Sequence, residues 1–119
     1  MIYEKAMQLA DALESREYGQ IKGMLKSNAG YCCLGVACEL SHVGEFMNSR
    51  YLCPGDSSWS SLPEGVMAYY GFYHREGIRR DGDDIVIGGK KYDSLINAND
   101  NGCTFTQIGQ YIRENWKAL

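Results

Sequence analysis

The chain has 119 residues, of which 45% are hydrophobic and 23% are charged, so it is long enough to bury the core of one globular domain spanning residues 1–119. Its net charge of −3 argues against bulk nucleic-acid binding, because proteins of that class carry a strongly basic surface. We also expect no membrane contact, since the sequence has neither a long apolar run nor an apolar leader segment.

The first segment, Ile2–Leu13, predicts an amphipathic helix, because its apolar side chains recur at helical spacing. These side chains are Ile2, Ala6, Leu9, Ala10 and Leu13. Two glycines, Gly19 and Gly23, then break any continuous helix. We therefore expect an irregular or β-like piece that leads into a turn over Ser27–Gly30.

The next segment is the most apolar part of the chain, since Glu39 is the one charged residue in Tyr31–Ser41. A helix that is apolar on nearly every face lies inside a domain, so we predict a buried central helix over Tyr31–Val43, with Gly44 as its left-handed C-terminal cap. An apolar run this short also fits a buried strand. Gly35 in mid-helix costs about 1 kcal/mol relative to alanine, which indicates that another backbone packs closely against it.

Three of the five cysteines, Cys32, Cys33 and Cys38, lie in this segment. Their C-C-x4-C spacing does not match the paired C-x2-C pattern of zinc sites, so we expect buried free thiols and no metal. Cys38 and His42 are four residues apart, which leaves a metal-binding fragment or a Cys–His nucleophile pair as an alternative. An odd number of cysteines excludes a complete disulfide framework and indicates a reducing, cytoplasmic compartment.

Helical periodicity is lost over Gly44–Ser61, where serine, glycine, asparagine and proline residues predict one long loop. Loops of this length are usually functional or mobile. The following segment, Leu62–Gly71, predicts a short helix with Ser61 or Leu62 as its N-cap and Pro63 in its first turn.

Asp84–Tyr92 predicts a β-hairpin, because a β-branched run, a Gly-Gly tip and a second short strand follow one another. We expect a further strand over Gly77–Arg80 to pair with Asp84–Ile87 across an Asp81–Asp83 turn.

Two helices are predicted after the hairpin. The first covers Ser94–Gly102, with Asp93 as its N-cap, and the second runs from Phe105 to about Lys117 after a capping box formed by Thr104 and Gln107. The predicted fold class is therefore α+β: a buried central helix, three to four other short helices and a small antiparallel hairpin or sheet.

Five basic residues gather around the predicted hairpin, and Tyr92 lies beside them. Arginine side chains bind phosphate bidentately, and Phe72, Tyr73 or Tyr92 could stack on a base. The candidate residues for binding a phosphate-bearing ligand are Arg75, Arg79, Arg80, Lys90, Lys91 and Tyr92. The alternative is a solvated β-edge that its charges protect from aggregation.

Three groups of residues resemble a family of small, mostly uncharacterised proteins of bacteriophages and prophages. The most specific is the block Y-C-C-L-G-V-x-C-E-L at Tyr31–Leu40. The others are the spaced set Leu13, Ser15, Tyr18, Gln20, Lys22 and Leu25, and the sets Leu62-Pro63-Glu64 and Asn99-Asp100-x-Gly102-x-Thr104-Phe105-x-x-Ile108. The resemblance implies a phage accessory protein in the host cytoplasm, and it supplies no catalytic residues.

We therefore expect a non-enzymatic, homo-oligomeric binding protein without a cofactor, which antagonises host defence by sequestering a phosphate-bearing nucleotide signal. The anti-defence role is supported only by the category of protein, because small, non-enzymatic phage accessory proteins are often antagonists of host defence. A first alternative is a protein–protein inhibitor of a host defence protein, which would use the tyrosine-rich surface and the Gly44–Ser61 loop. A second alternative is a small metal-binding protein or enzyme that uses Cys38 and His42.

Overall fold

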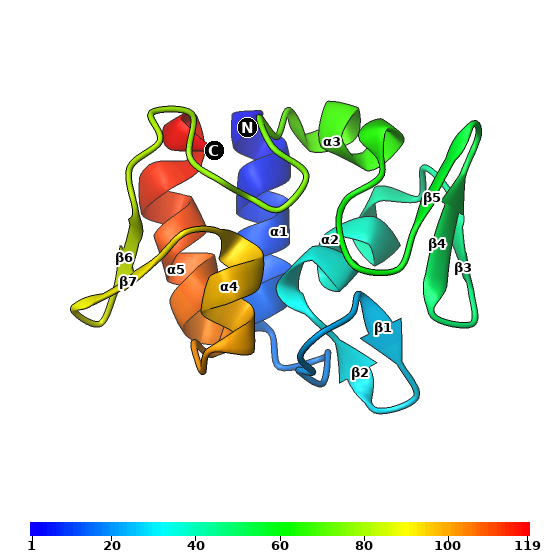
Figure 1. Cartoon of the computed structure of the whole chain (residues 1–119), viewed down its shortest axis with the longest axis horizontal. Coiled ribbons are helices and arrows are strands. Elements are labelled where there is room, and N and C mark those ends of the chain that lie inside the picture. The colour runs from blue at the N-terminus through cyan, green and yellow to red at the C-terminus, as the bar shows by residue number, and fades with distance from the viewer.

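Two helices from opposite ends of the chain lie side by side and carry much of the core (Figure 1). In the computed structural model, which describes all residues 1–119, these are α1 (Tyr3–Glu14) and α5 (Phe105–Asn115). Four of the five residues predicted to form the apolar stripe of α1 are buried, whereas Ile2 precedes the helix and is 45% exposed. Arg113 on α5 joins the pair by donating hydrogen bonds of 3.0 and 2.7 Å to Glu14 on α1.

The predicted central helix is confirmed as α2 (Cys33–Ser41), in which nearly every residue is buried. It is shorter at both ends than the sequence suggested. Tyr31 belongs to a strand, and the left-handed C-terminal cap is His42, with φ 53°, rather than Gly44. The three-residue β3 strand begins directly after Gly44, so the chain has to leave the helix earlier than its apolar pattern indicates.

Gly35 lies directly against the backbone of Leu25, so the predicted close approach of another backbone is confirmed, although Gly35 is the third residue of α2 rather than a mid-helix residue. A Cβ atom at position 35 would come within 1.8 Å of the Leu25 carbonyl oxygen. Leu25 leads into a small hairpin of β1 (Lys26–Ser27) and β2 (Gly30–Tyr31), whose turn lies within the predicted Ser27–Gly30 turn.

The prediction of one long loop over Gly44–Ser61 is wrong. This segment forms a three-stranded antiparallel sheet of β3 (Glu45–Met47), β4 (Arg50–Cys53) and β5 (Asp56–Ser58). Tight turns with left-handed residues at Asn48 (φ 58°) and Gly55 (φ 77°) join the strands. Strands of three or four residues leave too short an alternating pattern to be recognised.

The helix predicted over Leu62–Gly71 is confirmed as α3 (Glu64–Tyr70), which Gly71 closes with φ 73°. Its N-cap is Pro63 rather than Ser61 or Leu62. Next, the predicted Gly-Gly hairpin is confirmed as β6 (Ile85–Ile87) and β7 (Lys90–Tyr92).

The further strand expected over Gly77–Arg80 does not form. The backbone groups of Gly77 and Arg80 bond elsewhere, because Leu95 N–H donates to the Gly77 carbonyl and Arg80 N–H donates to the Ala118 carbonyl. These bonds tie the segment to the C-terminal helices instead of to β6.

The last helices are α4 (Leu95–Asp100), α5 and a final 3-10 turn, η1 (Trp116–Ala118). Ser94 rather than Asp93 caps α4, because its hydroxyl accepts from Asn97 N–H at 3.0 Å. The capping box of Thr104 and Gln107 at the start of α5 is confirmed.

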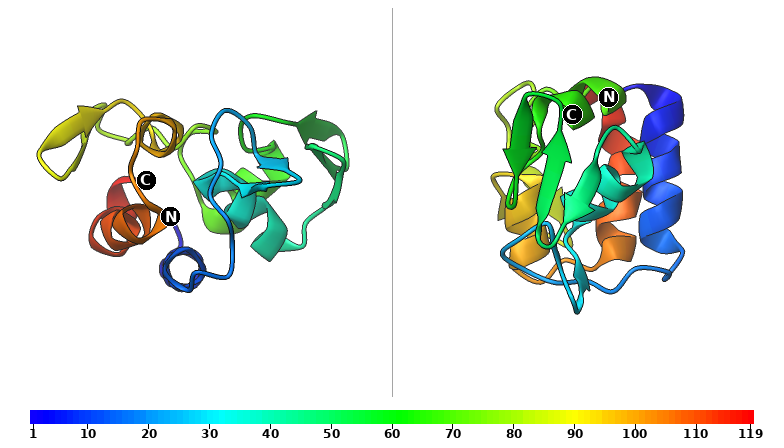
Figure 2. Two further views of the ribbon diagram at one scale, coloured as in Figure 1. Left: turned by 90° about the horizontal axis from the view of Figure 1, so that it is seen from below. Right: turned by 90° about the vertical axis from the view of Figure 1, so that its right-hand side faces the viewer.

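The architecture is therefore a single α+β domain, in which one cluster of 28 buried hydrophobic residues joins all five α-helices. The β6–β7 hairpin and the three-stranded sheet lie at opposite ends of the longest dimension (Figures 1 and 2). None of the helices is both long enough and apolar enough to span a membrane.

We expect Gly35→Ala to lower the free energy of unfolding by about 2 kcal/mol or more, because the added methyl group meets the Leu25 backbone and cannot move aside. Gly65→Ala in α3 is the matched control, since its Cβ would meet the side chain of Val43 at 3.0 Å. Alanine has a higher helix propensity than glycine, which offsets that contact, so we expect the free energy of unfolding of Gly65→Ala to change by no more than about 1 kcal/mol. Urea unfolding of both variants measures the difference, and equal stability would contradict the close backbone packing.

Candidate functional site

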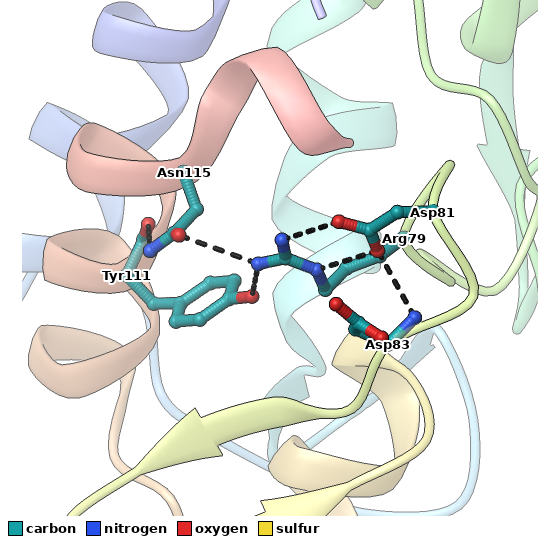
Figure 3. Close-up of polar contacts among 5 residues, drawn as sticks. All are labelled: Arg79, Asp81, Asp83, Tyr111 and Asn115. Atoms are coloured by element: carbon teal, nitrogen blue, oxygen red, sulfur yellow. Dashed lines mark hydrogen bonds and ion pairs between the residues drawn. The ribbon is translucent and has the colours of Figure 1, made fainter.

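Arg79, the central residue of the predicted basic surface, is bound within the protein (Figure 3). Its Nε and Nη2 donate to the two carboxylate oxygens of Asp81 at 3.0 and 2.6 Å, and its Nη1 donates to the Tyr111 hydroxyl at 2.8 Å and to Asn115 Oδ1 at 3.4 Å. Four of the five N–H donors of a guanidinium are thereby occupied. Arg79 therefore fastens the turn before β6 to α5 and has little capacity left for a phosphate.

The other predicted cations do not share a surface through strand pairing, because the Gly77–Arg80 strand is absent. Arg80 donates to the Gly71 carbonyl at 3.2 Å and its guanidinium lies 5.5 Å from the Tyr73 ring centre. Arg75 Nη2 lies 3.9 Å from Glu64 Oε1. Each is thus engaged locally.

Two exposed lysines, Lys90 and Lys91, remain on β7 without an ion pair. Tyr92 beside them is 8% exposed, so its ring lies in the core and cannot stack on a ligand. Phe72 is likewise buried at 6% exposure, whereas Tyr73 is 53% exposed and its ring centre lies 5.5 Å from the Arg80 guanidinium. Of the three rings predicted to stack on a base, Tyr73 is therefore the exposed one, and it lies beside Arg80.

Four of the five cysteines are buried, as predicted, and Cys53 is half-buried. Burial raises the pKa of the Cys33 and Cys38 thiols, and it raises that of Cys32 to about 11, so all three stay protonated at neutral pH and are poor nucleophiles. Cys38 has no exposed surface, whereas His42 is exposed, and no hydrogen bond joins them. No three histidine, cysteine or acidic side chains lie close enough together to hold a metal ion.

Two of the motif residues, Gln20 and Asn99, form a polar network that joins segments distant in sequence. Asn99 is 1% exposed; its Oδ1 accepts from Gln20 Nε2 at 2.9 Å and from Cys33 N–H at 3.2 Å, and its Nδ2 donates to the Ile21 carbonyl at 2.8 Å. Gln20 Nε2 also donates to the Cys103 carbonyl, while its Oε1 accepts from a backbone N–H at the start of α5. These motif residues therefore hold four segments together.

A cleft of about 460 Å³ lies between the turns of two hairpins, β1–β2 and β3–β4. Its lining is hydroxyl, amide, aromatic and ammonium groups, without a carboxylate: Lys26, Ser27, Asn28, Phe46, Asn48 and Ser49. Three of these groups form no hydrogen bond within the protein: the side-chain amides of Asn28 and Asn48 and the hydroxyl of Ser49. They are therefore available to a ligand.

Lys26 is the one charged residue of this cleft. Its Nζ lies 5.1 Å from the Tyr31 ring centre and 5.0 Å from that of Phe46, and it forms no ion pair. Two aromatic faces thus hold the ammonium group in place while leaving its N–H donors free. Sequence reasoning missed this site, because it treated β3 and β4 as one loop and so could not bring their turn beside Lys26.

A second hollow, of about 430 Å³, lies between β6 and α5. Val86, Thr106, Gln110 and the carboxylate of Glu114 are among its lining residues. Because its one charged side chain is an anion, this groove suits a phosphate less well than the Lys26 cleft does.

The Arg79–Asp81 contact predicts a specific loss of stability in acid. Arg79 and the Asp83 N–H lower the pKa of Asp81 from its ordinary 3.8 to about 2. The carboxylate therefore contributes stability that is complete above the ordinary pKa and is lost as the pH falls through about 2. We expect Asp81→Asn to flatten the decline of the unfolding free energy in this range.

Asp84→Asn is the matched control for this measurement, since the Asp84 side chain makes no hydrogen bond or ion pair. Asp84→Asn should leave the decline of the unfolding free energy with falling pH unchanged. Identical acid unfolding of wild type and Asp81→Asn would show that the Arg79 contact contributes nothing to the folded state.

Comparisons with known proteins give a family for this chain. No curated protein matches the sequence. No solved structure matches it either. The model of one family, Domain of unknown function (DUF8296), matches residues 3–116, from the first residue of α1 to the first residue of η1. The chain therefore belongs to the DUF8296 family.

Proposed function

We propose that this protein is a non-enzymatic binding protein that holds a small phosphate-bearing ligand in the cleft between the β1–β2 and β3–β4 turns. The observation that carries the proposal is Lys26, a cation held between the Tyr31 and Phe46 rings with no carboxylate partner. An unpaired cation in a carboxylate-free cleft of an acidic protein favours an anionic ligand.

The chemistry of the lining supports a ligand with few charges. One ammonium group can contact one phosphate, and the neutral donors of Ser27, Asn28, Asn48 and Ser49 can bind further phosphate or sugar oxygens. Phe46 is half-buried, so part of its ring forms an apolar wall against which a base can lie. A cyclic nucleotide combines these groups, whereas a polyphosphate would require more cations.

The biological setting that we propose follows from the resemblance to phage proteins. A phage accessory protein in the host cytoplasm that binds a cyclic nucleotide without cleaving it would lower the free concentration of a defence signal. Such a role requires tight binding and no catalytic group, and the buried, protonated thiols offer no nucleophile.

Isothermal titration with a panel of cyclic nucleotides, and with inorganic phosphate, tests the proposal. We expect at least one cyclic nucleotide to bind, and Lys26→Met to weaken that binding by at least about tenfold, because a lost charge-assisted hydrogen bond contributes more than 1.4 kcal/mol. Methionine keeps an apolar stem against the two rings, and a thermal melt without ligand checks that the variant folds.

The double variant Lys90→Met/Lys91→Met is the matched control, since these lysines lie at the other end of the molecule, on β7 (Figure 1). It should bind like wild type. Absence of binding by every compound would overturn the proposal, and a loss confined to the double variant would move the site to the β6–β7 hairpin.

A further inference from the structure

The outer face of the three-stranded sheet carries exposed apolar side chains. Met47 is 59% exposed and Trp59, which follows β5, is 49% exposed. Together with Leu52 and Arg50 they line a shallow depression of about 420 Å³. Tryptophan, methionine and arginine are the residue types that protein interfaces favour.

Strand register places these residues on one face. Glu45 pairs with Leu52, and Met47 pairs with Arg50, across the β3–β4 ladder. The alternate residues, Phe46 and Tyr51, form the inner pair, and Tyr51 is fully buried. Because side chains alternate along a strand, the four residues Glu45, Met47, Arg50 and Leu52 point outward.

The charges of this face cancel. It carries one carboxylate, on Glu45, and one guanidinium, on Arg50, although the whole chain has a net charge of −3. Two copies of an acidic chain repel each other through most surfaces, but a face that is neutral and apolar avoids this repulsion. The two charges also lie at diagonal corners of the four-residue set, on neighbouring strands.

We propose that this face binds the same face of a second copy of the chain around a two-fold axis. An axis along the diagonal from Met47 to Leu52 places Glu45 opposite the partner's Arg50, and Arg50 opposite the partner's Glu45. The same axis places Met47 and Leu52 against their own counterparts, with Trp59 at the rim. A two-fold interface is self-complementary in this sense, and the diagonal arrangement of opposite charges meets that requirement.

The dimer would bring the two proposed ligand clefts close to its interface. Asn48 and Ser49 in the β3–β4 turn line both the Lys26 cleft and the depression on the outer face. The interface itself needs no ligand, so it stands or falls independently of the proposed function.

Sedimentation equilibrium over a wide range of protein concentration, without ligand, tests the dimer. We expect wild type to dimerise, and Glu45→Lys or Arg50→Glu alone to raise the dissociation constant by at least about tenfold, because each places like charges opposite each other. Glu17→Lys changes the net charge by the same amount as Glu45→Lys at an exposed site off this face, and should dimerise like wild type.

An equimolar mixture of Glu45→Lys and Arg50→Glu chains provides the most specific test of the two-fold arrangement. In the mixed pair both contacts are again between opposite charges, so we expect a heterodimer with restored affinity, which a variant that merely misfolds cannot give. A wild-type chain that stays monomeric would overturn the proposal, and the partner of this face would then have to be a different protein. A mixture that stays monomeric would overturn the two-fold arrangement.

Discussion

The fold depends on one buried side-chain amide, that of Asn99 on α4. Its oxygen and nitrogen meet the Gln20 side chain, the first N–H of α2 and the carbonyl of Ile21, so a single residue joins the N-terminal connection, the central helix and α4. Gln20 extends the network to the start of α5. A buried amide is stable when its donors and acceptors are satisfied, and no buried side-chain nitrogen or oxygen in this protein lacks a partner. Gly35 adds a steric requirement, because Leu25 can approach α2 closely only where no side chain intervenes.

This arrangement gives several of the residues that define the family resemblance a structural role. Gln20, Asn99 and Gly35 hold segments of the fold together, and the thiols of Cys32, Cys33 and Cys38 are buried. The surfaces that we propose to bind a ligand or a second copy lie on two hairpin turns and the three-stranded sheet, at one end of the molecule (Figure 2). The proposed ligand cleft and the proposed dimer face adjoin each other there, through Asn48 and Ser49.

The sequence predicted those elements whose signals are local and repeated. Helical spacing of apolar residues located α1, an apolar block located α2, the Gly-Gly tip located β6–β7 and a capping box located α5. The three-stranded sheet escaped prediction because each strand is too short to establish an alternating pattern. The role of Arg79 escaped because two of its partners, Tyr111 and Asn115, are more than 30 residues away in sequence. The Lys26 cleft could not be foreseen for the same reason, since it exists only where two distant turns meet.

The unfolding free energy of Asn99→Ala, compared with that of Asn101→Ala, tests this account most directly. Asn101 is an exposed neighbour whose side chain makes one bond to the Asn97 carbonyl, so its loss should cost less than about 0.5 kcal/mol. Loss of the Asn99 amide leaves several buried groups without partners, and we predict a decrease of about 3 kcal/mol or more. An Asn99→Ala protein as stable as Asn101→Ala would contradict the structural role assigned to the motif residues.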